Sequence, residues 1–250
     1  GNGSTGILLA EETSLEYNGN LTVEGDKVSG IVVTKGSTVT ENTSANGKIN
    51  VGSTSSAAGG DSAKGSYGLV VKEGGNLKLS KTETTVNVTG EKSVGIFSEG
   101  EMNLGKTNVT TADGAVNFFA KDNGIISING GESKTGQKSL LFYQAGTNPK
   151  ILIKNEMKAT IEGGTDASNR GTAFFYQGDT GSGYSKFDSA AIGTWKDNIF
   201  KDSTNTNTLS KLTLNMQEGS RLFVASHVAM NLSNTNPGEL KNALGLKDII

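Results

Sequence analysis

Short apolar runs follow small residues along the chain and are separated by corners rich in glycine. The stretch Ser66–Ser80 reads Ser-Tyr-Gly, then Leu-Val-Val, breaks at Lys72–Gly75, and resumes as an alternating Asn-Leu-Lys-Leu. Successive side chains of a β-strand point to opposite faces, so Leu77 and Leu79 share one face and their polar neighbours share the other. The pattern predicts two very short strands around a tight corner.

This unit recurs from one end of the chain to the other, and internal repeats decide the fold before any other feature. The shortest intervals between the anchor residues of the apolar runs are 22–27 residues, and the longer intervals indicate the same unit with insertions. The anchors are Ile7, Ile31, Leu69, Ile96, Phe118, Leu141, Phe174 and Leu222.

Each period holds about three strands of three to five residues. Besides the anchor runs, the predicted strands are Ser37–Thr40, Lys48–Val51, Asn76–Leu79, Thr85–Val88, Glu101–Leu104 and Thr107–Thr110. A β-sandwich would use longer strands, a propeller blade would need four strands in some 40 residues, and a leucine-rich repeat would include a helix. An all-β, right-handed parallel β-helix fits best, because each short strand pairs with its equivalent one coil further on.

The β-helix interpretation carries two further expectations. The corners require positive φ, which accounts for the Gly and Asn found there. Eight to nine coils at the strand spacing of about 4.8 Å predict a rod of roughly 40 Å.

Two segments interrupt the coils, so residues 1–232 are predicted to form the β-helix with insertions at about 41–66 and 178–207. The first contains TSSAAGGDSAKGS and is expected to project from a corner as a loop, with Ser53–Lys64 as a second place for contacts. The second is rich in aromatic residues and holds the single tryptophan. Loops on a regular scaffold often carry binding residues, so the candidate binding residues are Tyr184, Phe187, Trp195 and Phe200. In the alternative interpretation these aromatic side chains fasten the loop to the face of the β-helix.

Residues 233–250 change character and are expected to cap the last coil or to link to a further segment. Asn236 precedes Pro237, and Glu239 follows three residues after Asn236, which is a helix-start signature. A short helix is therefore predicted near Pro237–Leu244.

Composition supports an ordered β-protein and excludes several functional classes. The 250 residues include 35 Gly and 2 Pro with a net charge of −2, but the apolar residues lie in patterned runs, which disfavours disorder. The absence of Cys excludes a disulfide scaffold and Cys-based metal or redox chemistry. With only Arg170 and Arg221 as arginines and no basic cluster, nucleic-acid binding has no support. No run approaches 18 apolar residues, so this segment is not expected to insert into a membrane. The pattern begins and ends in mid-unit, which predicts a piece of a longer chain.

Signals for catalysis or cofactor binding are weak, so no enzyme activity, cofactor or metal is predicted. Gly1–Gly6 matches GxGxxG by letter, but β-patterned residues follow where a dinucleotide site needs a helix. His227 is the single histidine and lies in no nucleophile motif. A β-helix lyase or hydrolase needs clustered acids, whereas the candidates do not recur at one coil position: Asp113, Asp122, Asp166, Asp179, Asp188 and Asp197.

The coil SVGIFSEGEMNLGKTNVTTADG, residues Ser93–Gly114, resembles the passenger domains of bacterial type V autotransporters. The phrases KSVGIF, YGLVV and EGEMNL are most similar to the large fusobacterial outer-membrane adhesins of the RadD-like group, and the resemblance covers Gly1 to about Val224. It implies a right-handed β-helix stalk at the bacterial cell surface that attaches to a receptor, protein or glycan, on other bacteria or host cells. The family has no shared binding residues to carry over.

These observations together predict a surface-displayed adhesin segment that acts as a rigid stalk and presents its loops for cell–cell or host-cell attachment. A polysaccharide-active β-helix enzyme and a pure spacer segment are the alternatives.

Overall fold

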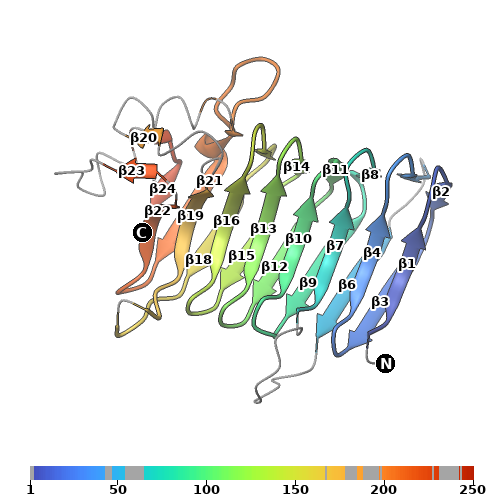
Figure 1. The fold of residues 1–250 in the computed structure, drawn as a ribbon, viewed down its shortest axis with the longest axis horizontal. Coiled ribbons are helices and arrows are strands. Elements are labelled where there is room, and N and C mark those ends of the chain that lie inside the picture. The colour runs from blue at the N-terminus through green and yellow to red at the C-terminus, as the bar shows by residue number, and fades with distance from the viewer. Residues whose placement is uncertain are drawn as a thin grey trace.

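The structure is a computed structural model of the chain. It describes residues 3–42, 47–53, 65–166, 168–177, 185–187, 197, 199–226, 228–230, 242 and 244–250. The coils stack into an elongated body with the N-terminus at one end and the C-terminus at the other (Figure 1). All strand pairs between coils are parallel and each strand pairs with the equivalent strand of the next coil, so the predicted parallel β-helix is confirmed.

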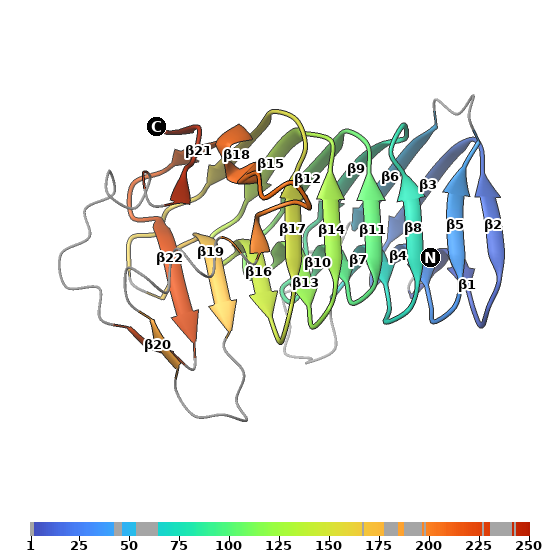
Figure 2. The same cartoon turned by 90° about the horizontal axis from the view of Figure 1, so that it is seen from above.

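Three parallel sheets, named A, B and C below, run along the body. Figure 2 shows the strands of sheets A and B from above. Sheet A is formed, in spatial order, by β1 (Thr5–Leu9), β4 (Ser29–Val33), β7 (Tyr67–Val71), β10 (Val94–Ser98), β13 (Val116–Lys121), β16 (Leu140–Ala145), β19 (Thr172–Gln177) and β22 (Arg221–Ser226). Sheet B is formed by β2 (Ser14–Tyr17), β5 (Thr38–Glu41), β8 (Asn76–Leu79), β11 (Glu101–Leu104), β14 (Ile125–Ile128) and β17 (Lys150–Ile153). Sheet C is formed by β3 (Asn20–Gly25), β6 (Lys48–Ser53), β9 (Glu83–Val88), β12 (Thr107–Thr111), β15 (Gly131–Thr135), β18 (Met157–Ile161), β21 (Leu212–Met216) and β24 (Asp248–Ile249).

The inward anchors form one column along sheet A, but two predicted anchors are off by one residue. Ile7, Ile31, Leu69, Ile96 and Phe118 are in register as expected. The next three members of the column are Phe142, Phe174 and Phe223, so the predictions of Leu141 and Leu222 were wrong.

The wrong assignment of Leu141 and Leu222 has a structural cause: the residue just before each anchor also faces the interior. In the early coils this residue is a glycine, so only one large side chain is visible in the sequence. In β16 it is the fully buried Leu141, and two adjacent apolar residues then compete for the same role.

The glycines before the anchors are required by space. A Cβ on Gly68 would lie 2.3 Å from the carbonyl oxygen of Gly95 and 2.5 Å from a methyl of Val86, and one on Gly95 would lie 2.5 Å from a methyl of Val109. Real Cβ atoms are not found at such distances, so the backbone of sheet A approaches sheet C here as closely as glycine permits.

A single apolar core runs through the coils between the three sheets. Phe118, Phe142 and Phe174 stack along its axis with ring centroids 5.5 and 5.6 Å apart, and all three are fully buried. Each such ring contributes about 1.5–3 kcal/mol by leaving water. Since each coil supplies only a few inward side chains, a core of this kind exists only in the stack.

The corners adopt positive φ as predicted, but glycine and asparagine are not the only residues there. Gly36 and Gly74 have φ of 73°, whereas Lys27, Lys92 and Lys138 reach 53–62°. The Lys92 amide donates to the carbonyl of Gly114, which occupies the corner of the next coil. Stacking of corner upon corner thus imposes the left-handed conformation on whichever residue is present, at roughly 1–2 kcal/mol for a non-glycine residue.

The far end of sheet B is covered by the segment that leads into the 3₁₀-helix η1 (Thr208–Lys211). The Asn207 side chain caps η1 by accepting from the Leu209 amide at 3.2 Å, and Leu209 is fully buried. Within the predicted second insertion, a short strand β20 (Ser185–Phe187) pairs with β23 (Val228–Met230). Within the predicted first insertion at about 41–66, residues 43–46 and 54–64 lie outside the described residues, and with them nearly all of the predicted contact loop Ser53–Lys64. Most of the predicted helix near Pro237–Leu244 also lies outside them.

Candidate functional site

The outer face of sheet A is more apolar than the outer faces of sheets B and C. Outward positions of sheets B and C are mostly polar or charged, as with Asn76 and Lys78 on β8 and Asn108 and Thr110 on β12. The register of sheet A instead places one apolar residue of every coil in a single outward column: Leu8, Val32, Val70, Phe97, Phe119, Tyr143, Phe175 and Val224. Together with the neighbouring outward residues Tyr67, Val94, Val116 and Leu140, they are called the apolar strip.

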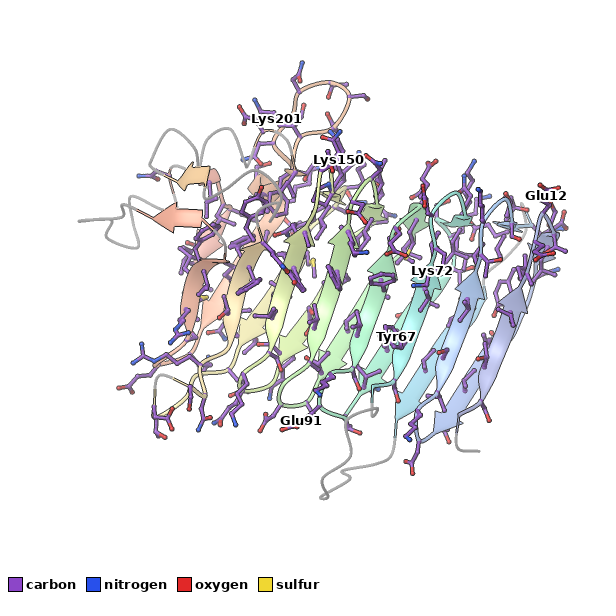
Figure 3. The ribbon with its side chains drawn as sticks, in the orientation of Figure 1. Glu12, Tyr67, Lys72, Glu91, Lys150 and Lys201 are labelled. Atoms are coloured by element: carbon purple, nitrogen blue, oxygen red, sulfur yellow. The ribbon has the colours of Figure 1, made fainter. Side chains whose placement is uncertain are left out.

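The apolar strip is physically separate from the core. Val70, Val94 and Phe97 form a cluster of their own on the outer side, against which Val32, Val116 and Phe119 pack. These neighbours leave Val70, Val94 and Phe97 only 5–7% exposed. At the N-terminal end Leu8 is 61% exposed, and Tyr67 is exposed near the beginning of β7 (Figure 3). Contiguous outward apolar residues on a soluble surface mark a contact site more often than scattered ones do.

Aromatic rings follow one another along the middle of the apolar strip. Phe119 and Tyr143 are stacked with centroids 4.1 Å apart and planes 13° apart. The pairs Phe97–Phe119 and Tyr143–Phe175 are edge-to-face at 5.2 and 5.1 Å. The rings thus cover each other's faces, so the strip favours broad apolar contact over the stacking of a ligand on one open ring.

A row of charged side chains borders the apolar strip at the end of β7, β10 and β13. Glu99 accepts from Lys121 at 2.8 Å and from Lys72 at 3.3 Å, and Lys121 also lies 3.3 Å from Asp122. Lys72, labelled just beyond the end of β7 in Figure 3, places its ammonium 4.7 Å from the ring centroid of Phe97. The border is therefore neutral and internally paired.

The ion pairs of the border shift the pKa values of Glu99 and Lys121. Partial burial acts to raise the pKa of Glu99, but the hydrogen bond from Lys121 and the charge of Lys72 outweigh it, and the pKa lies below its ordinary value. The hydrogen bond to Glu99 raises the pKa of Lys121. Both groups are charged at neutral pH, and the border presents two cations and two anions.

Tyr143 places a hydroxyl in the C-terminal half of the apolar strip. The Tyr143 hydroxyl donates to Oε1 of Gln177 on the next coil, and burial raises the pKa of the phenol. The phenol remains neutral at physiological pH, so the strip carries no charge of its own between Val70 and Phe175.

None of the four predicted binding residues belongs to the apolar strip. Phe200 is fully buried and packs edge-to-face on Phe142 and Phe174, with centroids 6.0 and 5.7 Å apart. Phe200 was predicted to make binding contacts on an insertion loop, but the structure places its ring in the core of the last coils. Tyr184 and Trp195 lie outside the described residues, and of Phe187 only the backbone in β20 is described.

The segment between Phe200 and η1 is held by an acidic turn. Asp202 accepts from the amide and hydroxyl of Thr204 and from the amide of Thr206, and these hydrogen bonds lower its pKa to about 2. Lys154 lies 3.7 Å from its carboxylate, and nearby the ammonium of Lys150 donates to the carbonyl of Lys201 at 3.4 Å (Figure 3). These contacts fasten the segment to the end of sheet B.

The apolar strip was not among the features predicted from the sequence, although the sequence contains a signal for it. Strands buried on one face alternate, as β8 does, whereas the runs YGLVV in β7 and VNFFAK in β13 place apolar residues at consecutive positions. Consecutive apolar positions in a short strand indicate apolar character on both faces.

Comparisons with protein-family models, with curated proteins and with solved structures found no match for this chain. Among the described residues, no group of three or more His, Cys, Asp or Glu side chains could hold a metal ion. Nor does that part of the chain contain a helix long and apolar enough to cross a membrane.

Proposed function

We propose that this chain is a surface-displayed adhesin segment of a bacterial autotransporter passenger, whose rigid β-helix carries a contact surface on its outside. The observation that supports the proposal is the apolar strip, a continuous apolar column on one sheet of a solenoid whose other outer faces are mostly polar. A pure spacer gains nothing from such a surface, because exposed apolar area promotes unwanted association.

The scaffold suits display. Each coil is hydrogen-bonded to the next across three sheets, so the outward residues of sheet A are held at the fixed strand spacing of about 4.8 Å. A rigid array of this kind loses little conformational entropy when it meets a receptor, which favours attachment through many weak contacts. The receptor is a component of another bacterial or host-cell surface, and the chain acts outside the cell.

The test is an attachment assay with the chain displayed on beads or on a heterologous cell surface. Tyr143→Lys places a charge in the middle of the apolar strip and is expected to reduce attachment at least tenfold. The matched control is Thr110→Lys, which adds the same charge at an exposed position of β12 and should leave attachment unchanged.

A second variant separates the apolar strip from the aromatic insertion. Tyr184→Ala combined with Trp195→Ala, which keeps the buried Phe200, should lower attachment only if that insertion contributes contacts of its own. Unchanged attachment in every variant would favour the spacer, and equal loss in Tyr143→Lys and Thr110→Lys would remove the strip from the proposal.

A further inference from the structure

The outward column of sheet A varies in side-chain size along the body. Its N-terminal half has the aliphatic residues Leu8, Val32 and Val70, followed by Phe97 next to the midpoint. Its C-terminal half has the aromatic residues Phe119, Tyr143 and Phe175 and ends with Val224. The eight strands place the midpoint of the sheet between β10 and β13.

We infer that sheet A is a symmetric interface between two copies of this chain, packed face to face through their apolar strips. The inference rests on the proposed function and names the partner, a second copy displayed on the same or a neighbouring cell. The two-fold axis runs parallel to the strands and passes between β10 and β13, so that all eight strands of each copy take part.

In the middle of each half of the strip, this axis places a small side chain against a large one. Counting coils outward from the midpoint, Val70 faces the partner's Tyr143 and Val32 faces the partner's Phe175. The two central strands, β10 and β13, bring Phe97 against the partner's Phe119. Packed surfaces reach interior density when large and small residues alternate across the contact, so the pairs Val70–Tyr143 and Val32–Phe175 make these parts of the strip complementary to each other.

The charged border is also self-complementary under the same axis. Glu99 on β10 faces the partner's Lys121 on β13, and the symmetry repeats this pair. Lys72 faces the partner's Ala145, so no like charges meet there. A border with two cations and two anions does not select a strongly charged partner, whereas it fits a copy of itself.

The available area agrees with a reversible dimer. Eight strands at about 4.8 Å and about five residues at 3.3 Å give roughly 600 Å² from each copy, or about 1,200 Å² in total. This value lies at the lower end of specific interfaces, where transient complexes are found. Since the face of a sheet has no unpaired backbone groups, a second sheet packed about 10 Å away satisfies the surface without further hydrogen bonds.

The first experiment is sedimentation velocity on the full 250-residue chain between about 1 and 500 µM, a range in which a transient dimer dissociates and forms. Wild type and Thr110→Lys should form a reversible dimer, and Tyr143→Lys should weaken it at least tenfold, with circular dichroism verifying that each variant is folded. A wild-type chain that stays monomeric, or a dimer that Tyr143→Lys does not weaken, would overturn the inference.

A second experiment tests the geometry and does not depend on a disruptive variant. Because the chain has no cysteine, Val32→Cys and Phe175→Cys chains can be prepared separately and joined by a bis-maleimide that spans about the 10 Å between packed sheets. The mixture should give crosslinked dimers in clear excess over either variant alone, and a mixture of Val32→Cys with Thr110→Cys should not. Equal crosslinking in all mixtures, or none, contradicts the proposed axis.

The two proposals fail separately. If the chain is monomeric in solution while Tyr143→Lys still abolishes attachment to cells, the strip binds a different molecule and the adhesin proposal stands. If the chain dimerises as described but mediates no attachment, the interface stands and the adhesive function does not.

Discussion

The Thr111 hydroxyl donates a 2.6 Å hydrogen bond to Oδ1 of Asn117 inside the β-helix, where both side chains are buried. The Asn117 amide nitrogen in turn donates to the Ser133 hydroxyl at 2.7 Å and to the carbonyls of Val109 and Lys134. Asn117 stands in the column that holds glycine in the earlier coils. The column therefore accepts a polar side chain where the neighbouring strands supply partners for every polar atom of it.

Replacing this amide by a hydrocarbon of similar size should be costly. Asn117→Leu removes the acceptor of the buried Thr111 hydroxyl, whereas the Ser133 hydroxyl keeps its hydrogen bond to the Val109 carbonyl. The free energy of unfolding should therefore fall by about 1–3 kcal/mol. Urea denaturation followed by circular dichroism measures the loss. Asn103→Leu, on the exposed side of β11, is the control and should change stability by less than about 0.5 kcal/mol.

Gln144 should respond in the opposite direction. It is fully buried in β16, and neither polar atom of its side chain has a hydrogen-bond partner among the described residues. Since an unsatisfied buried polar group costs about 1–3 kcal/mol, Gln144→Met should raise the free energy of unfolding by about 1 kcal/mol. A loss of stability on this substitution would show that the amide is satisfied in solution.

The close approach between sheets A and C predicts a sharp difference between two glycines. Gly95→Ala places a methyl 2.5 Å from Val109, so the coil must open and the midpoint of denaturation should fall by an amount equivalent to about 2 kcal/mol or more. Gly52→Ala on β6 meets only the side chain of Glu24 at 3.7 Å and should be neutral or slightly stabilising. Equal effects of the two substitutions would contradict the packing described.

The charged border should contribute to stability in a pH-dependent way. Because the folded-state pKa of Glu99 is lowered, its contribution is present above the ordinary carboxyl pKa near 4.5 and is lost as the pH falls through the lowered value. Glu99→Gln should cost under about 1 kcal/mol at pH 7, since Lys72 and Lys121 are about half exposed. Thermal melts of both proteins from pH 7 to pH 2 should converge at the acidic end, whereas a constant difference would exclude this electrostatic origin.

Phe200 should behave as a core residue. Phe200→Ala removes a ring that contacts both Phe142 and Phe174 and should lower the free energy of unfolding by about 3–5 kcal/mol. Phe200→Leu refills most of the volume and should recover more than half of that loss. If Phe200→Ala instead leaves stability unchanged but reduces attachment, the ring belongs to a binding surface after all.

The repeat and its local geometry were determined by the sequence. The strands Asn76–Leu79 and Glu101–Leu104 were predicted with the bounds that the structure has, because a two-residue alternation between tight corners is a local property of the chain. The parallel β-helix followed from the repeat, because strands so short can bury their apolar faces only when equivalent coils are stacked.

Only the tertiary structure decided how neighbouring coils are aligned and which apolar residues face outward. Whether Leu141 or Phe142 continues the column of Phe118 depends on hydrogen bonds to the adjacent coil, and the apolar strip appears only when one outward residue from each of eight strands is brought into line. The burial of Phe200 depends likewise on rings that precede it by 26 and 58 residues in the sequence. Alternation along one strand is set by backbone geometry, whereas alignment between strands is set by contacts between residues far apart in the chain.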